Sequence, residues 1–460
     1  EDAYINLPLF RANLPLGAER ADEKALTRFH TMNSRGLATF LPIFFEWRGT
    51  ETPLVSLVGR GGQLMAYSPF DTQTNFNLTI SAVSGAGKSF LTNELIAAML
   101  GTGGKVWVID VGYSYKNLCE SLGGQYMSFG ADSDICLNPF SSLTTDEEFE
   151  DVQDILFHIL SAMAAPKAGL DDFQGAELKR ILQEQFHIHR SDLSIDLIAD
   201  ACIEAARELK EGDFTEKRIG DVGRGLSAFR SSGPYGKYFS GRSNVDFKRP
   251  FVLLELEELK SKRHLQTIVL LLLIYQIQHG MYLGDINIKK LMVIDEAWDL
   301  LSDPQIANFI EAGYRRFRKY NGSACIVTQS LADLHGSQTG KAILANSAST
   351  LMLQQKPATI TKLSEGPEAE IPKETAEILK TVHTIRGKYS EIHLSTPYGT
   401  GIGRFYVDPF TALLYSTDPP DKAALKRFRD QGMSLAEAIE AVLTSRGKAR
   451  TETNPLKRVV

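Results

Sequence analysis

The stretch from Asn75 to Leu91, NFNLTISAVSGAGKSFL, carries the residue types that bind phosphate groups. An apolar run that favours a strand leads into a loop of small residues, and a run that favours a helix follows Gly-Lys-Ser. The glycines let backbone N–H groups point at phosphate oxygens, and the helix N-terminus adds a favourable dipole. In this pattern Lys88 would bridge the β- and γ-phosphates of a nucleotide, and Ser89 would hold Mg²⁺ through its hydroxyl. The residues expected to bind the nucleotide are Ser84, Gly85, Ala86, Gly87, Lys88, Ser89 and Phe90.

The motif departs from the usual pattern at one position. Ala82 stands where the first glycine is expected, so the motif reads A-x-x-x-x-G-K-S. An ordinary Gly/Ser turn can produce such a relaxed motif by chance. Ala82 occupies a position that only makes a turn, and Lys88 and Ser89 are in place. The surrounding sequence therefore has to decide between a phosphate-binding loop and an ordinary turn.

Two acids follow a second apolar run, LMVIDE at 291–296. This pattern is typical of a buried strand that delivers carboxylates to its C-terminal edge, where ligands bind in open α/β sheets. There Asp295 would hold Mg²⁺ through water, and Glu296 would orient and deprotonate an attacking water as the general base. A strand end that simply turns polar is the alternative. The Gly-Lys-Ser loop upstream favours the catalytic interpretation.

Two further positions have both a functional and a structural interpretation. Gln329 ends the run SACIVTQ, where it would contact the γ-phosphate or merely end a strand. The basic run YRRFRKY at 314–320 would place cations at a helix C-terminus, or it would supply an arginine finger to a neighbouring subunit. We expect Arg318 to be this finger, with Arg315 and Arg316 as the alternates.

Strands that alternate with helices must position these residues. The run KVWVID at 105–110 follows the helix after the phosphate loop and predicts the second strand of a βαβ unit. Its last residue, Asp110, would assist the Mg²⁺ site or simply start a loop. Further strands are expected at 125–129, 250–255, 290–296, 323–329 and 349–354, and helices at 264–282 and 303–320. This alternation predicts an α/β fold with a mostly parallel sheet.

Short β-like runs also lie outside this alternation. Those at 41–47, 53–58 and 63–68 are separated by turn residues, and they predict a small antiparallel element packed on the main sheet. Two more runs, 390–395 and 403–407, come near the end of the chain.

Residues 143–230 change character. Thr145-x-x-Glu148 is a capping box, and apolar residues then recur at helical spacing. No segment alternates with period two, so the stretch predicts an all-α insertion, and its length favours a separate lobe over a loop. The expected domains are a lead-in from a missing upstream domain at 1–40, an α/β domain at 41–142 and 231–442, the helical insertion at 143–230, and a flexible tail at 443–460.

Composition limits the classes of protein. The 460 residues are 43% hydrophobic and 23% charged, which predicts a soluble protein with a large core. The net charge of -6 argues against a broad basic face for nucleic acid but leaves room for a local channel. The four cysteines have no C-x-x-C spacing, which is typical of buried residues in a reducing compartment. The longest apolar run, 268–274, is far shorter than the roughly 20 residues of a transmembrane helix.

The order of several motifs is more specific than any one of them. The chain reads AVSGAGKS, VIDVGYSY, LGGQY and LNPF, then VIDEAW, RKYNG and the strand end TQS, and finally GRFYVDPF. This order resembles the conjugative-transfer ATPases of type IV secretion systems, in their TraC-like branch of VirB-type assembly ATPases. The resemblance covers about residues 41–442, and the pair LGGQY and LNPF is far more specific than the phosphate loop, which very many NTPases share.

The resemblance implies a RecA-like P-loop ATPase that uses ATP and Mg²⁺ to energise pilus biogenesis and substrate transfer. Members of this family are cytoplasmic and dock at the inner-membrane face of the secretion channel, where they meet other secretion subunits. They assemble as hexamers or stacked dimers. A finger arginine would complete the site across a subunit interface, so we expect the isolated chain to be monomeric and nearly inactive. In related motors the finger arginine precedes the strand that carries the glutamine, and this position maps onto Arg318.

Two other functions stay open. A DNA translocase or coupling protein of the HerA–FtsK type would carry basic pore loops or transmembrane helices, and neither is obvious here, although nucleic acid stays open as a partner. A scaffold that binds nucleotide to set its shape would barely turn it over, and the intact set of catalytic residues argues against it. We expect the contacts to the adenine base within the stretch Arg404–Phe410, without assigning them to single residues.

Overall fold

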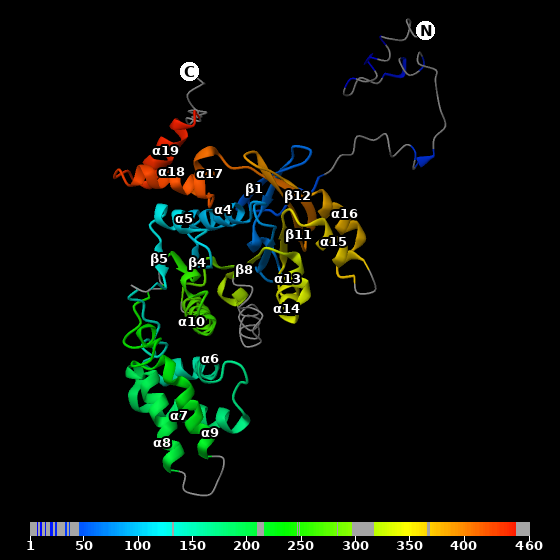
Figure 1. Cartoon of the computed structure of the whole chain (residues 1–460). Helices are drawn as coiled ribbons and strands as arrows, with labels where there is room; N and C mark the ends of the chain where they lie inside the picture. Colours follow the sequence, from blue (N-terminus) through cyan, green and yellow to red (C-terminus); the bar gives the residue numbers. More distant parts are fainter. Residues whose placement is uncertain are drawn as a thin grey trace. The chain divides into compact units, whose positions relative to one another are not determined.

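Figure 1 shows the computed structural model of the chain. The chain forms two compact units, 1–46 and 47–460, and the sheet with its helices belongs to the second. The predicted helix at 303–320 lies mostly outside the described residues, as do most of the predicted lead-in and the end of the predicted tail. The described residues are 46–447 except 131–132, 209–215, 246, 248, 283, 297–316 and 366–368, together with scattered residues among 1–45.

The described strands form one sheet. In sheet order they are β2 (Leu64–Tyr67), β1 (Val55–Gly59), β12 (Gly399–Phe405), β11 (Tyr389–Thr396), β9 (Ser349–Met352), β3 (Leu78–Ser81), β8 (Gly322–Thr328), β7 (Lys290–Asp295), β4 (Lys105–Asp110), β6 (Phe251–Glu255) and β5 (Gln125–Ser128), and β10 (Thr384–Ile385) pairs with β11. The strands from β9 to β5 are parallel to one another, whereas β10, β11, β12, β1 and β2 pair antiparallel. The sheet is therefore mostly parallel, as the sequence predicts.

The first two strands extend this sheet instead of packing on it. Ser56 of β1 pairs with Ala66 of β2, and Val58 at the other edge of β1 pairs with Arg404 of β12. The predicted antiparallel pairing of these runs is confirmed for β1 and β2, but the prediction that they pack on the main sheet is wrong. The first run, 41–47, lies mostly outside the described residues. The physical reason is that the outer edge of β12 carries backbone N–H and C=O groups that need partners, and β1 provides them.

Helices cover both faces of the sheet, which is the doubly wound arrangement. On one face α4 and α5 contribute side chains to the buried cluster, and on the other face α10 and α13 to α16 do so. The α-helices are α4 (Lys88–Gly101), α5 (Lys116–Ser121), α6 (Asp146–Ala164), α7 (Asp172–His189), α8 (Ile195–Glu208), α9 (Glu216–Gly225), α10 (Arg263–Tyr282), α13 (Leu331–Gly336), α14 (Gln338–Ala345), α15 (Pro357–Ser364), α16 (Lys373–Thr381), α17 (Pro409–Leu414), α18 (Pro419–Arg429) and α19 (Leu435–Ser445).

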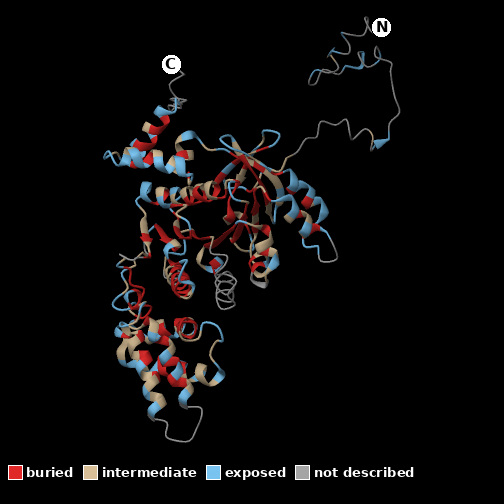
Figure 2. Ribbon diagram, in the orientation of Figure 1, coloured by how far each residue is buried: buried red, intermediate tan, exposed pale blue. Residues whose placement is uncertain are grey.

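The parallel strands are apolar on both faces. In β4, Trp107 and Ile109 join the cluster shared with α10, whereas Val106 and Val108 join the cluster shared with α4. All four side chains are fully buried. A strand covered on both sides needs this continuous run of apolar residues, which explains why KVWVID shows no alternation. Figure 2 shows the same burial throughout the central strands and along α10.

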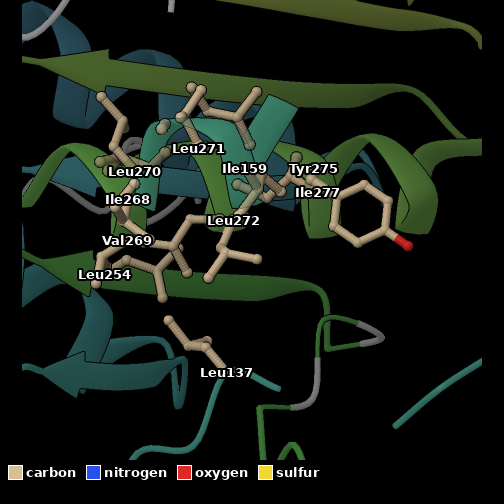
Figure 3. Close-up of a cluster of buried hydrophobic side chains, with 14 of the residues drawn as sticks. Leu137, Ile159, Leu254, Ile268, Val269, Leu270, Leu271, Leu272, Tyr275 and Ile277 are labelled. Atoms are coloured by element: carbon tan, nitrogen blue, oxygen red, sulfur yellow. The ribbon is translucent and has the colours of Figure 1, made fainter. Parts of the chain in front are cut away.

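The helix α10 is apolar on all sides because the sheet and other helices surround it. Leu272 and Tyr275 of α10 lie in one buried cluster with Ile159 of α6 and Leu254 of β6 (Figure 3). The predicted helix at 264–282, buried all round, is confirmed. Through α10 the cluster continues from the sheet into α6 to α9.

The helices α6 to α9 occupy the stretch for which the sequence predicts an all-α insertion. The capping box is confirmed, since the Glu148 N–H donates to the Thr145 hydroxyl at 3.2 Å and the Glu148 carboxylate accepts from the Thr145 N–H. The limits of the insertion, 143–230, stay a prediction, as do the other domain limits.

The buried cluster around α10 gives a stability prediction. Leu272→Ala removes a fully buried side chain, and we expect it to lower the free energy of unfolding by about 2–5 kcal/mol. Ile286→Ala is the control because Ile286 is 56% exposed, and we expect a change within about 0.5 kcal/mol. Urea denaturation measures both, and equal midpoints for the two variants would contradict this account of the core.

Candidate active site

The loop between β3 and α4 has the conformation that close approach to a phosphate needs. Gly85 and Gly87 have φ angles of 79° and 99°, in the left-handed region that glycine adopts without strain. Ala82 is fully buried, and its N–H donates to the Thr328 carbonyl at 3.2 Å. No left-handed conformation is needed at Ala82, so the usual glycine is dispensable there.

The start of α4 presents N–H groups that need acceptors. The backbone N–H groups of Lys88, Ser89 and Phe90 donate to no acceptor among the residues that the structure describes. Ser84 and Gly85 of the loop are exposed to solvent. Free N–H groups together with the helix dipole make this end of α4 a binding site for an anionic group.

Two of the predicted binding residues contribute in different ways. The Ser89 hydroxyl has no partner in the described part of the chain, so it is available to a ligand. The Phe90 ring packs edge-on against Tyr415, with 6.1 Å between the ring centroids. Phe90 therefore offers a nucleotide its backbone N–H, not its side chain.

Lys88 joins the loop to the end of β7. Its Nζ donates to Oδ1 of Asp295 at 2.8 Å and to Oε1 of Glu296 at 2.9 Å. The other oxygen of Asp295, Oδ2, accepts from the Tyr115 hydroxyl at 2.6 Å. The Asp295 side chain is 0% exposed and that of Lys88 is 9% exposed. Two carboxylates therefore share one cation, and Asp295 is closed off from solvent whereas the Glu296 side chain is 31% exposed.

Glu296 is held from two sides. Its φ angle of 56° is uncommon for a residue with a side chain, and such backbone strain is concentrated at functional sites. Gln329 Nε2 donates to the same oxygen of Glu296 at 2.6 Å. The parallel strands β7 and β8 are neighbours, with Asp295 paired to Val327, so their ends meet at one edge of the sheet. The structure thus brings Glu296, Gln329, Asp295 and Lys88 together.

Burial and Lys88 act in opposite directions on the two carboxylates. Burial raises the pKa of Asp295 above its ordinary value, although Lys88 opposes this shift. Burial also tends to raise the pKa of Glu296. The attraction of Lys88 and the hydrogen bonds from Lys88 and Gln329 outweigh burial, so the pKa of Glu296 is lowered. Burial tends to lower the pKa of Lys88, and the two carboxylates raise it. Glu296 is therefore ionised at neutral pH, as a general base must be.

Asp110 lies beside this site in a second buried acidic pair. It ends β4 opposite Glu255 of β6, and both side chains are fully buried. Asp110 accepts the Ser114 N–H at 2.6 Å, and Glu255 accepts the Tyr113 N–H at 2.8 Å, so the pair holds the loop after β4. Burial raises the pKa of Asp110, and the nearby charges of Asp295 and Glu255 raise it further. The proposed assistance to Mg²⁺ remains a prediction.

Sequence reasoning missed two side chains at this edge. Glu255 ends the run PFVLLE just as Asp110 ends KVWVID, so the shared pattern of a strand closed by an acid was the available signal. Tyr115 had no comparable signal, because its contact with Asp295 depends on how the loop after β4 folds back.

Arg318 lies away from this site. It belongs to a short 3-10 helix, Arg318–Tyr320, which precedes β8, and it is exposed. Gln329 follows the other end of β8, so the two are separated by a strand of 7 residues, roughly 23 Å at about 3.3 Å per residue. Arg318 therefore does not reach the site of its own chain. The alternates, Arg315 and Arg316, lie outside the described residues.

Ser89 and Asp295, the residues expected to hold Mg²⁺, suit an ion that binds together with the phosphates of a nucleotide. The Ser89 hydroxyl is available, but both oxygens of Asp295 already accept hydrogen bonds, from Lys88 and Tyr115. In the described ranges, no three His, Cys, Asp or Glu side chains are grouped as a metal site. Mg²⁺ commonly takes one or two protein oxygens and completes its shell with water and substrate phosphates. The site suits that mode of binding.

A glycine-rich loop on a mostly parallel sheet, with its lysine against two acids of a neighbouring strand, defines a P-loop nucleoside triphosphatase. The comparison of the sequence with protein families agrees with this class. The chain belongs to the TraG P-loop domain family, which it matches over residues 66–446. Within that family it is similar to TraC in sequence and to VirB4 in fold.

Two relatives support the assignment. Protein TraC of Escherichia coli (strain K12) is 31% identical over 376 residues, which are 80% of this chain and 42% of TraC. The conjugal transfer protein TrbE of Rhizobium radiobacter is 22% identical over 325 residues, which are 66% of this chain and 37% of TrbE. The chain thus spans less than half the length of either relative.

Solved structures establish the fold. VirB4 of Thermoanaerobacter pseudethanolicus superposes with a TM-score of 0.63 at 22% identity, over 79% of this chain and 99% of that one. The plasmid coupling protein TrwB, in complex with GDPNP, superposes with a TM-score of 0.53 at 12% identity, over 85% of this chain and 92% of that one. The prediction of a RecA-like α/β fold is confirmed.

The shared cation gives a prediction about stability and pH. We expect Lys88→Ala to destabilise the nucleotide-free protein at pH 8 by about 3 kcal/mol, since two carboxylates, one of them fully buried, lose their cation. The cost should be smaller at pH 5, because the pKa of Asp295 is already raised and rises further without Lys88, so falling pH protonates it. Lys422→Ala, at an exposed lysine of α18, is the control. Thermal unfolding at both pH values measures the difference, and an equal loss at both would contradict the assignment.

Proposed function

We propose that this chain binds ATP together with Mg²⁺, hydrolyses it to ADP and phosphate, and so energises a type IV secretion or conjugation apparatus. One observation carries the proposal: the Lys88 ammonium, at the start of α4, lies 2.8 Å from Asp295 and 2.9 Å from Glu296. These three side chains are the lysine, the Mg²⁺-binding acid and the base that phosphoryl transfer to water needs.

In the proposed reaction, ATP replaces the carboxylates as the partner of Lys88. Phosphate oxygens accept hydrogen bonds from Lys88 and from the N–H groups at the start of α4. Glu296, released from Lys88, orients the attacking water and takes its proton. Mg²⁺, which would be held by Ser89 and through water by Asp295, supplies the positive charge that offsets charge developing on the phosphates. Gln329 is hydrogen-bonded to Glu296, so it is placed to respond to loss of the γ-phosphate.

The proposed site is completed by a second copy of the chain. Arg318 is exposed and precedes β8, whereas the Lys88 site lies at the other end of that strand. As an arginine finger, Arg318 would therefore act on the nucleotide of a neighbouring subunit. The working form is therefore an oligomer, such as a hexamer. A lone monomer would turn over ATP slowly, because the finger contributes only when subunits meet.

The relatives support the proposed cellular role. TraC and TrbE, the latter named as a conjugal transfer protein, match this chain over part of their length, and VirB4 shares its fold. We place the protein in the cytoplasm at the inner-membrane face of a secretion channel, where it works with other subunits in pilus biogenesis and substrate transfer. None of the helices in the described part of the chain has the length and apolar character that crossing a bilayer requires.

The alternatives find less support. For a DNA translocase or coupling protein of the HerA–FtsK type, the support is the similarity in fold to the coupling protein TrwB, whose sequence is 12% identical. A nucleotide-gated scaffold needs no general base, whereas Glu296 is held in a strained conformation between two donors. Salt-sensitive binding of duplex DNA would favour the first alternative.

Glu296→Gln separates an ATPase from a scaffold. We expect turnover to fall by at least about 100-fold while ATP still binds, because the amide keeps the shape but cannot take a proton. Glu374→Gln, at an exposed position of α16, is the control and should leave turnover unchanged. Phosphate release and equilibrium ATP binding are the measurements. A wild-type chain that oligomerises, binds ATP and has no activity to lose would favour the scaffold.

Mixing two inactive variants tests the shared site. We expect Arg318→Ala to lose about 1,000-fold in turnover, and Lys319→Ala, its exposed neighbour, to lose little. In a mixture of Arg318→Ala and Lys88→Ala subunits, some interfaces combine an intact lysine with an intact finger. Turnover should then exceed that of either variant alone at the same total concentration. No recovery, with mixed oligomers verified by mass, would rule out Arg318 as the finger.

A further inference from the structure

The hairpin of β10 and β11 lies directly against the phosphate loop. The Thr384 hydroxyl donates to the Ala86 carbonyl at 2.9 Å, and a Cβ placed on Gly87 would lie 2.4 Å from Oγ of Ser390. The Thr384 N–H donates to Oε1 of Gln354 at 3.3 Å. Thr384 therefore fixes the β10 end of the hairpin to the phosphate loop and to Gln354, which follows β9, and Ser390 of β11 lies close to Gly87.

The turn between β10 and β11 carries Arg386. A Cβ placed on Gly85 would lie 3.2 Å from Nη2 of Arg386, so the guanidinium rests against the exposed part of the phosphate loop. Arg386 is itself exposed, and it has no hydrogen-bond or ion-pair partner among the described residues. Two arginines from neighbouring segments differ, since Arg60, which follows β1, and Arg404 of β12 both pair with Glu391 of β11.

The balance of charge at the site favours an additional cation such as Arg386. Lys88 carries one positive charge, and Asp295 and Glu296 at 2.8 and 2.9 Å bring two negative ones. A nucleotide adds further negative charge, only part of which Mg²⁺ offsets. An unpaired guanidinium beside the loop supplies several donors in a planar fork that suits phosphate oxygens.

We propose that Arg386 binds the phosphate chain of the nucleotide in its own subunit, so that the β10–β11 hairpin forms a second wall of the site. This inference rests on the proposed function, because it needs a nucleotide in the loop. It assigns Arg386 a role in the same chain, whereas Arg318 acts on a neighbour. The other interpretation is a solvated cation at the tip of a hairpin, and Lys388 provides the comparison, since it is an exposed cation in the same turn.

Equilibrium binding of Mg-ATP tests the proposal. The Kd is measured by calorimetry at protein concentrations where the mass is that of a monomer, for wild type, Arg386→Ala, Arg386→Lys, Lys388→Ala and Lys88→Ala. We expect Arg386→Ala to weaken binding about 10- to 100-fold, the effect of losing charge-assisted hydrogen bonds. Arg386→Lys should recover part of the affinity, and Lys388→Ala should stay within about twofold of wild type. Unchanged thermal unfolding of each variant verifies its fold.

The outcomes separate this inference from the function on which it rests. If wild type binds ATP and Lys88→Ala weakens binding, but Arg386→Ala binds as wild type does, the role of Arg386 is overturned and the proposed function stands. An equal loss in Arg386→Ala and Lys388→Ala would also overturn it, since charge near the loop would then suffice. If wild type fails to bind ATP, the proposed function fails and this inference fails with it.

Discussion

The charge cluster around Lys88 is the constraint on which the rest of the structure depends. A cation and a fully buried carboxylate are stable away from water only when geometry and hydrogen bonding compensate for the lost hydration. Tyr115 and Gln329 supply the additional hydrogen bonds, and the strained backbone of Glu296 brings its carboxylate to the same ammonium. Such a cluster is satisfied without ligand and can exchange partners when phosphate arrives, which is what a nucleotide site requires.

The fold supports this cluster from both sides of the sheet. Apolar clusters on the two faces hold β7 and β8 beside β3, and the parallel direction of these strands brings their polar ends to one edge. The antiparallel strands β11 and β12 extend the sheet and carry the β10–β11 hairpin onto the phosphate loop. The same sheet therefore positions the lysine, the acids and the hairpin arginine without a separate domain for any of them. The helices α6 to α9 join the core through α10, on the face away from α4.

The sequence predicts those features whose physical cause is local. The loop before Lys88 is recognisable because its glycines and small residues stand between a strand-forming run and a helix-forming run. Asp295 is recognisable because it ends an apolar run, and ligands bind beyond the carboxyl ends of strands in open α/β sheets. The roles of Tyr115 and Arg386 could not be predicted, because they come from segments whose distance to the loop is set by strand order. The pairing of β1 with β12 was misjudged for the same reason, since two edges far apart in the chain cannot be matched from composition. The helix expected at 303–320 lies mostly outside the described residues, so Arg318 is known only by its place before β8.

A crystal structure of the chain with Mg²⁺ and a non-hydrolysable ATP analogue would test the central claim most directly. The account predicts that a phosphate oxygen lies about 2.8 Å from Nζ of Lys88 and that the ammonium has moved beyond hydrogen-bonding distance of Glu296. A nucleotide bound in the loop while Lys88 keeps both carboxylates as partners would contradict it. So would a nucleotide bound elsewhere on the chain.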